Sequence, residues 1–127
     1  MNHTELENSD SILLSIKQML GLQDEYDAFD MDIIMHINSV ISILNQMGVG
    51  EENFKVQDET QTWDEFMTDK HNMEEVKSYI YLKVKLLFDP PLNSAVLQSQ
   101  KELISELEWR LNVECDDTWE KTDSKGD

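Results

Sequence analysis

The chain has 127 residues, which suits one domain with a modest core and is too short for two independent domains. It has 27 Asp and Glu residues against 10 Lys and Arg, and the net charge of -17 opposes any binding mode that neutralises nucleic-acid phosphates with basic side chains. This charge also disfavours an anionic membrane surface, and no apolar run approaches the roughly 20 residues of a membrane-spanning helix.

The ends of the chain and its cysteine content bear on the cell compartment. Residues 1–10 contain no Lys or Arg and therefore lack the positive segment of a secretory signal. Cys115 is the only cysteine, so an internal disulfide and a cysteine-rich zinc site are excluded, and a reducing cytoplasm is indicated. The acidic neighbours of Cys115 disfavour its thiolate, and we interpret this residue as incidental rather than as a nucleophile.

Two apolar stripes at helical spacing predict the first two helices. The first stripe runs from Ile12 to Leu20, and Gly21 follows it as a glycine C-cap. The second runs from Ile33 to Met47 and ends at Gly48. Its entry contains three aspartates that can cap free amides and stabilise the positive end of the helix dipole: Asp27, Asp30 and Asp32.

Residues 51–72 lose the helical period and predict a long acidic loop. A short extended piece is expected at residues 54–56. Thr62 and Glu65 match a capping box and predict a single helical turn, whose Trp63 and Phe66 would pin the loop to the core. Loops of this length are often functional or become ordered by a partner.

Two further helices follow, separated by Pro90 and Pro91. Asn72 and Glu75 form a second capping-type pair that opens the third helix, which is apolar around most of its circumference and is therefore expected to be central. Asn93 or Ser94 caps the fourth helix. Its expected packing stripe consists of Val96, Leu97, Leu103, Ile104, Leu107 and Leu111.

Two tryptophans lie off the predicted core stripes. Trp109 is one of them, and Glu106 and Arg110 beside it form a favourable i, i+4 ion pair. After Val113 the chain becomes polar and acidic without an apolar period, so residues 114–127 are interpreted as a tail in which Trp119 can anchor to a partner. Filling the core is the alternative role for these tryptophans, but Trp and Arg are enriched in interface hot spots, so we predict an interface. The predicted interface residues are Trp109, Arg110, Trp119, Tyr81 and Lys85.

Motifs of catalysis and of metal or phosphate binding are weak in this sequence. Asp30 and Asp32 begin like a calcium loop, but the central glycine is missing. Asp32 and His36 lie one turn apart, yet no further ligand motif accompanies them. Residues 48–50 resemble the start of a phosphate loop, but two glutamates follow. We therefore expect no catalytic residue, no metal and no cofactor, although carboxylates brought together by folding remain a third reading, that of a small enzyme.

Four segments of the chain resemble a known family. They are residues 11–17 (SILLSIK), 32–39 (DIIMHINS), 79–91 (YIYLKVKLLFDPP) and 106–112 (ELEWRLN). These segments are similar, in matching order, to the small head-tail connector proteins of long-tailed bacteriophages, over about residues 11–113. The FDPP and EWRLN strings are the most specific parts.

This resemblance implies an all-α subunit, without catalysis or cofactor, that assembles as a ring, typically of twelve copies. The ring would lie under the portal protein in the neck of the virion, join the DNA-filled head to a tail-side completion or terminator protein, and line the DNA channel. A negative wall suits such a channel because it repels the passing phosphates, so DNA would pass without specific binding. The protein would be made in the cytoplasm of the bacterial host.

The predicted fold is therefore a compact bundle of about four helices, with a long acidic loop between the second and third helices and an acidic C-terminal tail. Its expected organisation is an N-terminal extension (1–10), a helical connector domain (11–113) and the tail (114–127). The charge alone suggests one alternative function, an acidic DNA mimic that binds and inhibits a nucleic-acid-binding protein.

Overall fold

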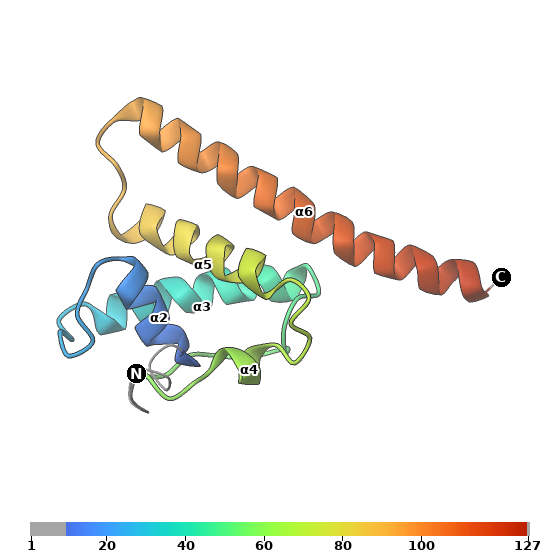
Figure 1. The fold of residues 1–127 in the computed structure, drawn as a ribbon, viewed down its shortest axis with the longest axis horizontal. Helices are drawn as coiled ribbons and strands as arrows, with labels where there is room; N and C mark the ends of the chain where they lie inside the picture. Colours follow the sequence, from blue (N-terminus) through green and yellow to red (C-terminus); the bar gives the residue numbers. More distant parts are fainter. Residues whose placement is uncertain (1–9, 127) are drawn as a thin grey trace.

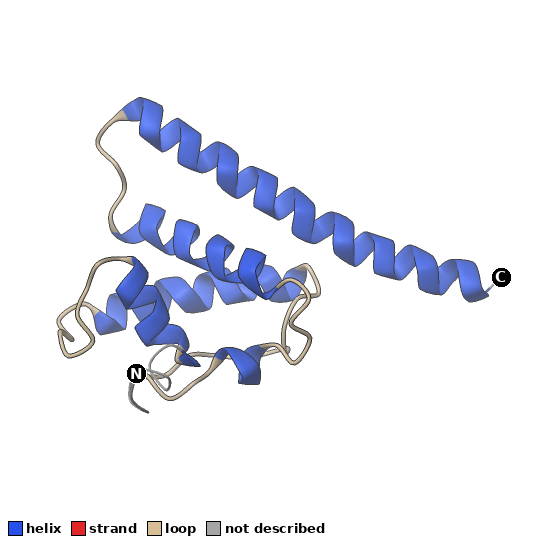
Figure 2. Ribbon diagram, in the orientation of Figure 1, coloured by secondary structure: helices blue, strands red, loops and turns tan. Residues whose placement is uncertain are grey.

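The computed structural model describes the backbone of residues 10–126 and the side chains of residues 10–113. Five helices follow one another in this part of the chain: α2 (Ile12–Met19), α3 (Asp30–Gln46), α4 (Trp63–Phe66), α5 (Met73–Phe88) and α6 (Ser94–Gly126). The described residues form helices and loops without a strand, apart from one isolated antiparallel bridge between Ser11 and Thr62 (Figure 2). The all-α prediction is confirmed.

The helices pack in the order α2, α3, α5, α6, so that α5 lies between α3 and α6 (Figure 1). Helix α6 covers one side of α5, while α2 and the short α4 lie on the other side of the molecule (Figure 1). The predicted central position of the third helix is thereby confirmed for α5. Its fully buried side chains are Val76, Tyr79, Ile80 and Val84.

Helix α2 begins and ends as its sequence predicts. The Ser11 hydroxyl caps it by accepting a hydrogen bond from the amide of Leu14 at 3.2 Å. At the other end Gly21 has a φ of 87°, and the amides of Gly21 and Leu22 donate to the carbonyls of Gln18 and Lys17. This pair of bonds is a Schellman motif, which needs a residue in the left-handed conformation.

The start of α3 differs in one respect from the expectation. Its N-cap residue is Phe29, and no side chain caps the helix, so the predicted capping by the aspartates is wrong. Asp30 and Asp32 do lie in the first turn, where their charge is favourable to the helix dipole. The carboxylate of Asp30 instead forms an ion pair with Lys17.

The long connection from α3 to α5 is held to the core at three points. The Asn38 side chain exchanges two hydrogen bonds with the backbone of Val56, at 2.8 and 2.9 Å. No strand forms at residues 54–56. The side-chain amide of Asn38 instead makes the two hydrogen bonds to the Val56 backbone that a neighbouring strand would make. The predicted capping box of Thr62 and Glu65 starts α4, and Trp63 and Phe66 are both buried, so the predicted turn and its anchors are confirmed.

Gly50 allows this connection to approach α4 closely. Its φ is 80°, and a Cβ atom at this position would lie 2.3 Å from the ring of Phe66. Any side chain here would both collide with the ring and occupy a strained backbone conformation. Gly50 is therefore explained by its close packing against Phe66, and no phosphate-binding role is needed to account for it.

The entries of α5 and α6 are capped differently. Asn72 is the N-cap residue of α5 but makes no side-chain capping bond, so the predicted start is right and the predicted capping pair is wrong. The Asn93 side chain accepts from the amides of Ala95 and Val96 and caps α6. Asp89, Pro90 and Pro91 separate the two helices as expected, because proline cannot continue a helical hydrogen-bond ladder.

Helix α6 differs from the prediction in its stripe and in its length. Ile104, Leu107 and Leu111 are buried, whereas Val96 and Leu103 are about half exposed and are not core residues. The backbone remains helical to Gly126, where a tail had been expected after Val113. The acidic segment lacks an apolar stripe. It also contains no proline, and no glycine before Gly126, so it has no residue that breaks a helix.

Candidate interaction surfaces

Trp109 and Arg110 form an exposed pair on α6. The Trp109 side chain is 65% exposed, because the buried stripe of α6 faces α5 and Trp109 lies off that stripe. Arg110 is half exposed and donates from Nη2 to the Glu106 carboxylate at 2.8 Å, as the sequence predicted. Guanidinium has five donors, so this contact leaves others available for a second acceptor. The pair is a candidate contact surface.

The other predicted interface residues do not lie next to Trp109 and Arg110 in the chain. Tyr81 and Lys85 lie one turn apart on α5, both partly buried, and Tyr81 packs against the core. The predicted residues therefore form two local pairs, one on α5 and one on α6. Trp119 lies among the residues whose side chains the structure does not describe.

A second apolar surface lies near the start of α3 and was not predicted. Met31 and Met35 are 80% and 65% exposed, one turn apart on the side of α3 opposite its buried stripe. Nearby, Phe29 makes edge-to-face contacts with the rings of Tyr26 and Phe88, at centroid distances of 5.8 and 5.2 Å. The only sequence signal for this surface is the spacing of the two methionines, which falls outside the apolar stripe of α3.

A groove of about 430 Å³ opens between α2, α3 and two loops. Its apolar floor is formed by Leu13, Leu14 and Ile34. Carboxylates line its walls: Asp24, Glu25, Asp27, Asp30, Asp58 and Glu59. The Thr60 hydroxyl and amide donate to Asp58, and these hydrogen bonds lower the pKa of its carboxyl group. The groove is therefore apolar at its base and strongly negative around its rim.

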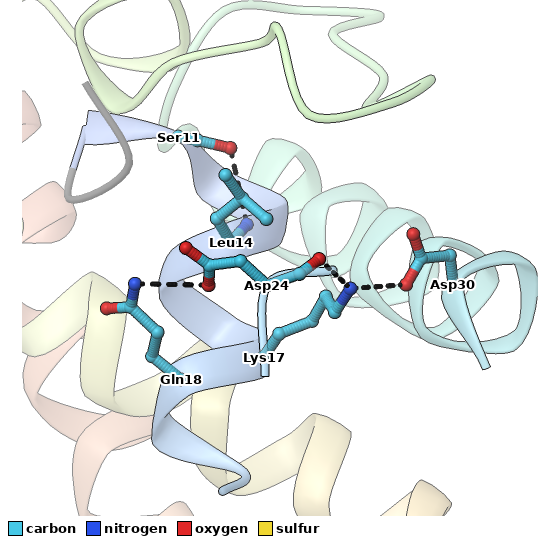
Figure 3. A network of polar contacts seen from close by, with 6 residues as sticks. All are labelled: Ser11, Leu14, Lys17, Gln18, Asp24 and Asp30. Carbon is cyan, nitrogen blue, oxygen red and sulfur yellow. Dashed lines mark hydrogen bonds and ion pairs between the residues drawn. The ribbon is translucent and has the colours of Figure 1, made fainter. Parts of the chain in front are cut away.

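A buried lysine fixes one wall of this groove (Figure 3). The side chain of Lys17 is fully buried. Its ammonium group donates to the Asp24 carbonyl at 2.9 Å and pairs with the Asp30 carboxylate at 2.8 Å. Gln18 in turn donates to the Asp24 carboxylate. Lys17 thus ties α2 to the following loop and to the first turn of α3. The burial of Lys17 could not be predicted from local sequence patterns, because both of its partners are brought to it by the tertiary fold.

The contact between α5 and α6 includes one buried hydroxyl. Tyr79 donates to the Glu108 carboxylate at 2.7 Å. Burial raises the pKa of the Tyr79 hydroxyl well above its usual range, and the hydrogen bond and negative charge of Glu108 raise it further. The bond links the two helices beside the buried stripe of α6.

The residues considered for metal chemistry are not gathered into a site. Asp32 is exposed and His36 is partly buried, and within the described part of the chain no group of three or more His, Cys, Asp or Glu side chains is arranged to hold a metal ion. Cys115 lies among the residues whose side chains are not described. Within residues 10–126 no helix has the length and apolarity needed to cross a membrane.

Comparison with known proteins identifies the family. A family model described as phage connector protein matches residues 12–118, which include α2 to α5 and most of α6. The chain belongs to this family of phage connector proteins. Neither curated proteins nor solved structures gave a match.

Membership gives this connector a general role at the head-tail connection of a phage particle, in association with phage proteins. The predicted resemblance is confirmed. The exposed Trp109 and the groove rim both remain accessible on the folded subunit.

Proposed function

We propose that this connector forms a ring of identical copies beneath the portal protein, joins the DNA-filled head to a tail-side completion or terminator protein, and lines the channel through which DNA passes. Twelve copies are the number that the resemblance implies. In this proposal the protein is made in the host cytoplasm, resides in the neck of the virion, and performs no reaction and needs no cofactor.

The observation that carries the proposal is the exposed Trp109–Arg110 pair on a chain of the connector family. A tryptophan left 65% exposed beside an arginine is the composition typical of an interface hot spot. The net charge of -17 supports the channel role, since like charge discourages binding between the wall and DNA phosphates.

Deletion of the gene from the phage that carries it tests the joining role directly. Electron microscopy of the lysate should show separate heads and free tails in place of tailed particles. Normal tailed particles would contradict the proposal. They would favour the acidic DNA mimic, which should bind a basic partner with a strong salt dependence and be absent from purified virions.

Trp109→Ala tests the interface. The monomer should keep its stability because Trp109 lies outside the core, while ring or portal assembly weakens by about 2 kcal/mol or more, the range of a hot-spot residue. Thermal melting and mass measurement in solution report the two effects separately. Ser99→Ala, at an exposed position on α6 ten residues before Trp109, is the control and should leave assembly unchanged. Full assembly of Trp109→Ala would exclude this residue from the interface.

A further inference from the structure

We infer that the acidic groove between α2 and α3 is the receptor for Trp109 and Arg110 of a neighbouring copy, so that one subunit's α6 docks into the next subunit's groove. The inference rests on the proposed ring and names the two surfaces that would build it. A closed ring of identical subunits needs two different, complementary patches on each copy.

The first argument is the chemistry of the two surfaces. The groove combines an apolar floor with a rim of carboxylates, and its volume of about 430 Å³ lies in the range of sites that take up a compact ligand. Trp109 supplies a large aromatic ring for the floor, and Arg110 supplies a guanidinium, which binds carboxylates through paired hydrogen bonds. An aromatic residue with an arginine next to it fits an apolar base with acidic walls.

The second argument is the distribution of positive charge. Residues 24–32 hold five carboxylates and no basic residue. The nearest described cation, Lys17, is buried and already bound to Asp24 and Asp30. Seven of the chain's ten cations lie instead on α5 and α6: Lys77, Lys83, Lys85, Lys101, Arg110, Lys121 and Lys125. A neighbouring copy that presents Trp109 and Arg110 therefore places a guanidinium against the carboxylates of the groove rim.

The third argument is position. Helix α6 packs on α5, and α5 lies between α6 and α3, whose first turns line the groove together with α2 (Figure 1). A chain cannot fill its own groove with Trp109 in this arrangement, but it can fill the groove of the next copy while offering its own groove to another. Such a contact is head-to-tail, which is the kind that closes into a ring.

Site-directed cross-linking tests the contact. In a Cys115→Ser background, one set of copies carries Glu25→Cys at the groove rim and another carries Ser105→Cys on α6. A short bismaleimide should link the two variants when they are mixed, but should give little product with either alone. Dimers from Ser105→Cys alone would show an α6-to-α6 contact and overturn the inference.

A charge exchange in the phage provides the second test. Arg110→Glu alone, or Glu25→Lys with Asp27→Lys alone, should lower the number of joined particles by about tenfold or more, because each places like charges in contact. A chain that carries Arg110→Glu, Glu25→Lys and Asp27→Lys together should restore the number of joined particles. Thermal melting of each purified variant confirms that it folds.

The two proposals fail in different ways. If the gene deletion separates heads from tails but neither cross-linking nor charge exchange gives the expected result in intact particles, the joining role stands and the groove is not the receptor. If the protein stays monomeric in solution and in particle extracts, the ring and the docking contact are both excluded.

Discussion

Two glycines, Gly21 and Gly50, differ in what surrounds them, and this difference should be measurable in the stability of the fold. Gly50 and Gly21 both have positive φ, at 80° and 87°, but only Gly50 faces an obstacle, the Phe66 ring. Gly21→Ala should cost about 1–2 kcal/mol of unfolding free energy from backbone strain. Gly50→Ala should cost about 1–3 kcal/mol more from overpacking. Urea denaturation of the two variants measures the difference, and equal losses would mean that Phe66 moves aside freely.

Tyr79 gives the connector a pH dependence at the alkaline end. Its pKa is raised above the usual 10.0, chiefly by burial and then by the Glu108 carboxylate. The folded state therefore holds the proton more tightly than the unfolded state, so this stabilising contribution is complete below about pH 10 and is lost as the pH rises above that value. Unfolding free energies measured from pH 8 to 11 should fall more steeply in the wild type than in Tyr79→Phe. Parallel curves would contradict the assignment.

At the level of elements, the connection between α3 and α5 depends on Asn38. Asn38→Ala removes both bonds to the buried Val56 backbone and should cost about 1–3 kcal/mol through unsatisfied polar groups. Hydrogen exchange at the Val56 amide should accelerate, and proteolysis should increase within residues 51–61. Ser39→Ala, which removes only an exposed bond within α3, is the control. Unchanged exchange at Val56 in Asn38→Ala would show that α4 alone holds the connection.

The elements that could be predicted from the sequence are those with local signals. Periodic apolar residues and the end signals Gly21, Pro90 and the Thr62–Glu65 box gave α2, α4 and α5 close to their observed bounds. Contacts between distant residues could not be predicted in this way. Asn38 and Val56 are 18 positions apart, and Lys17 meets Asp24 and Asp30 only because the loop after α2 and the first turn of α3 lie against it. The length of α6 could not be predicted because residues 114–126 have no apolar period, which is the signal on which the helix predictions depend.

The candidate surfaces were only partly predictable for the same reason. Exposure of Trp109 follows from its position on α6 relative to the stripe, so it could be inferred locally. The groove could not be predicted from the sequence, because its lining residues come from two loops and two helices that are separated in the chain.

At the level of the whole molecule, the excess of carboxylates sets the response to salt. A net charge of -17 on 127 residues creates self-repulsion that destabilises the compact state. Raising NaCl from 10 mM to 100 mM shortens the screening length from about 30 Å to about 10 Å, so the Tm should rise by several degrees. Calorimetry of the monomeric Trp109→Ala variant separates this effect from assembly. A falling Tm would mean that the ion pairs outweigh the repulsion.

The buried Lys17 has a consequence for recognition at the groove. Its ammonium group binds the Asp24 carbonyl and the Asp30 carboxylate in the free subunit, and Gln18 binds the Asp24 carboxylate, so this part of the groove does not have to be ordered when a partner arrives. Binding to a preformed surface avoids the loss of about 0.5–1.5 kcal/mol for each side chain that would otherwise be immobilised. In the proposed docking, a small contact per subunit can therefore have a defined geometry, since this part of the groove is already ordered in the free subunit.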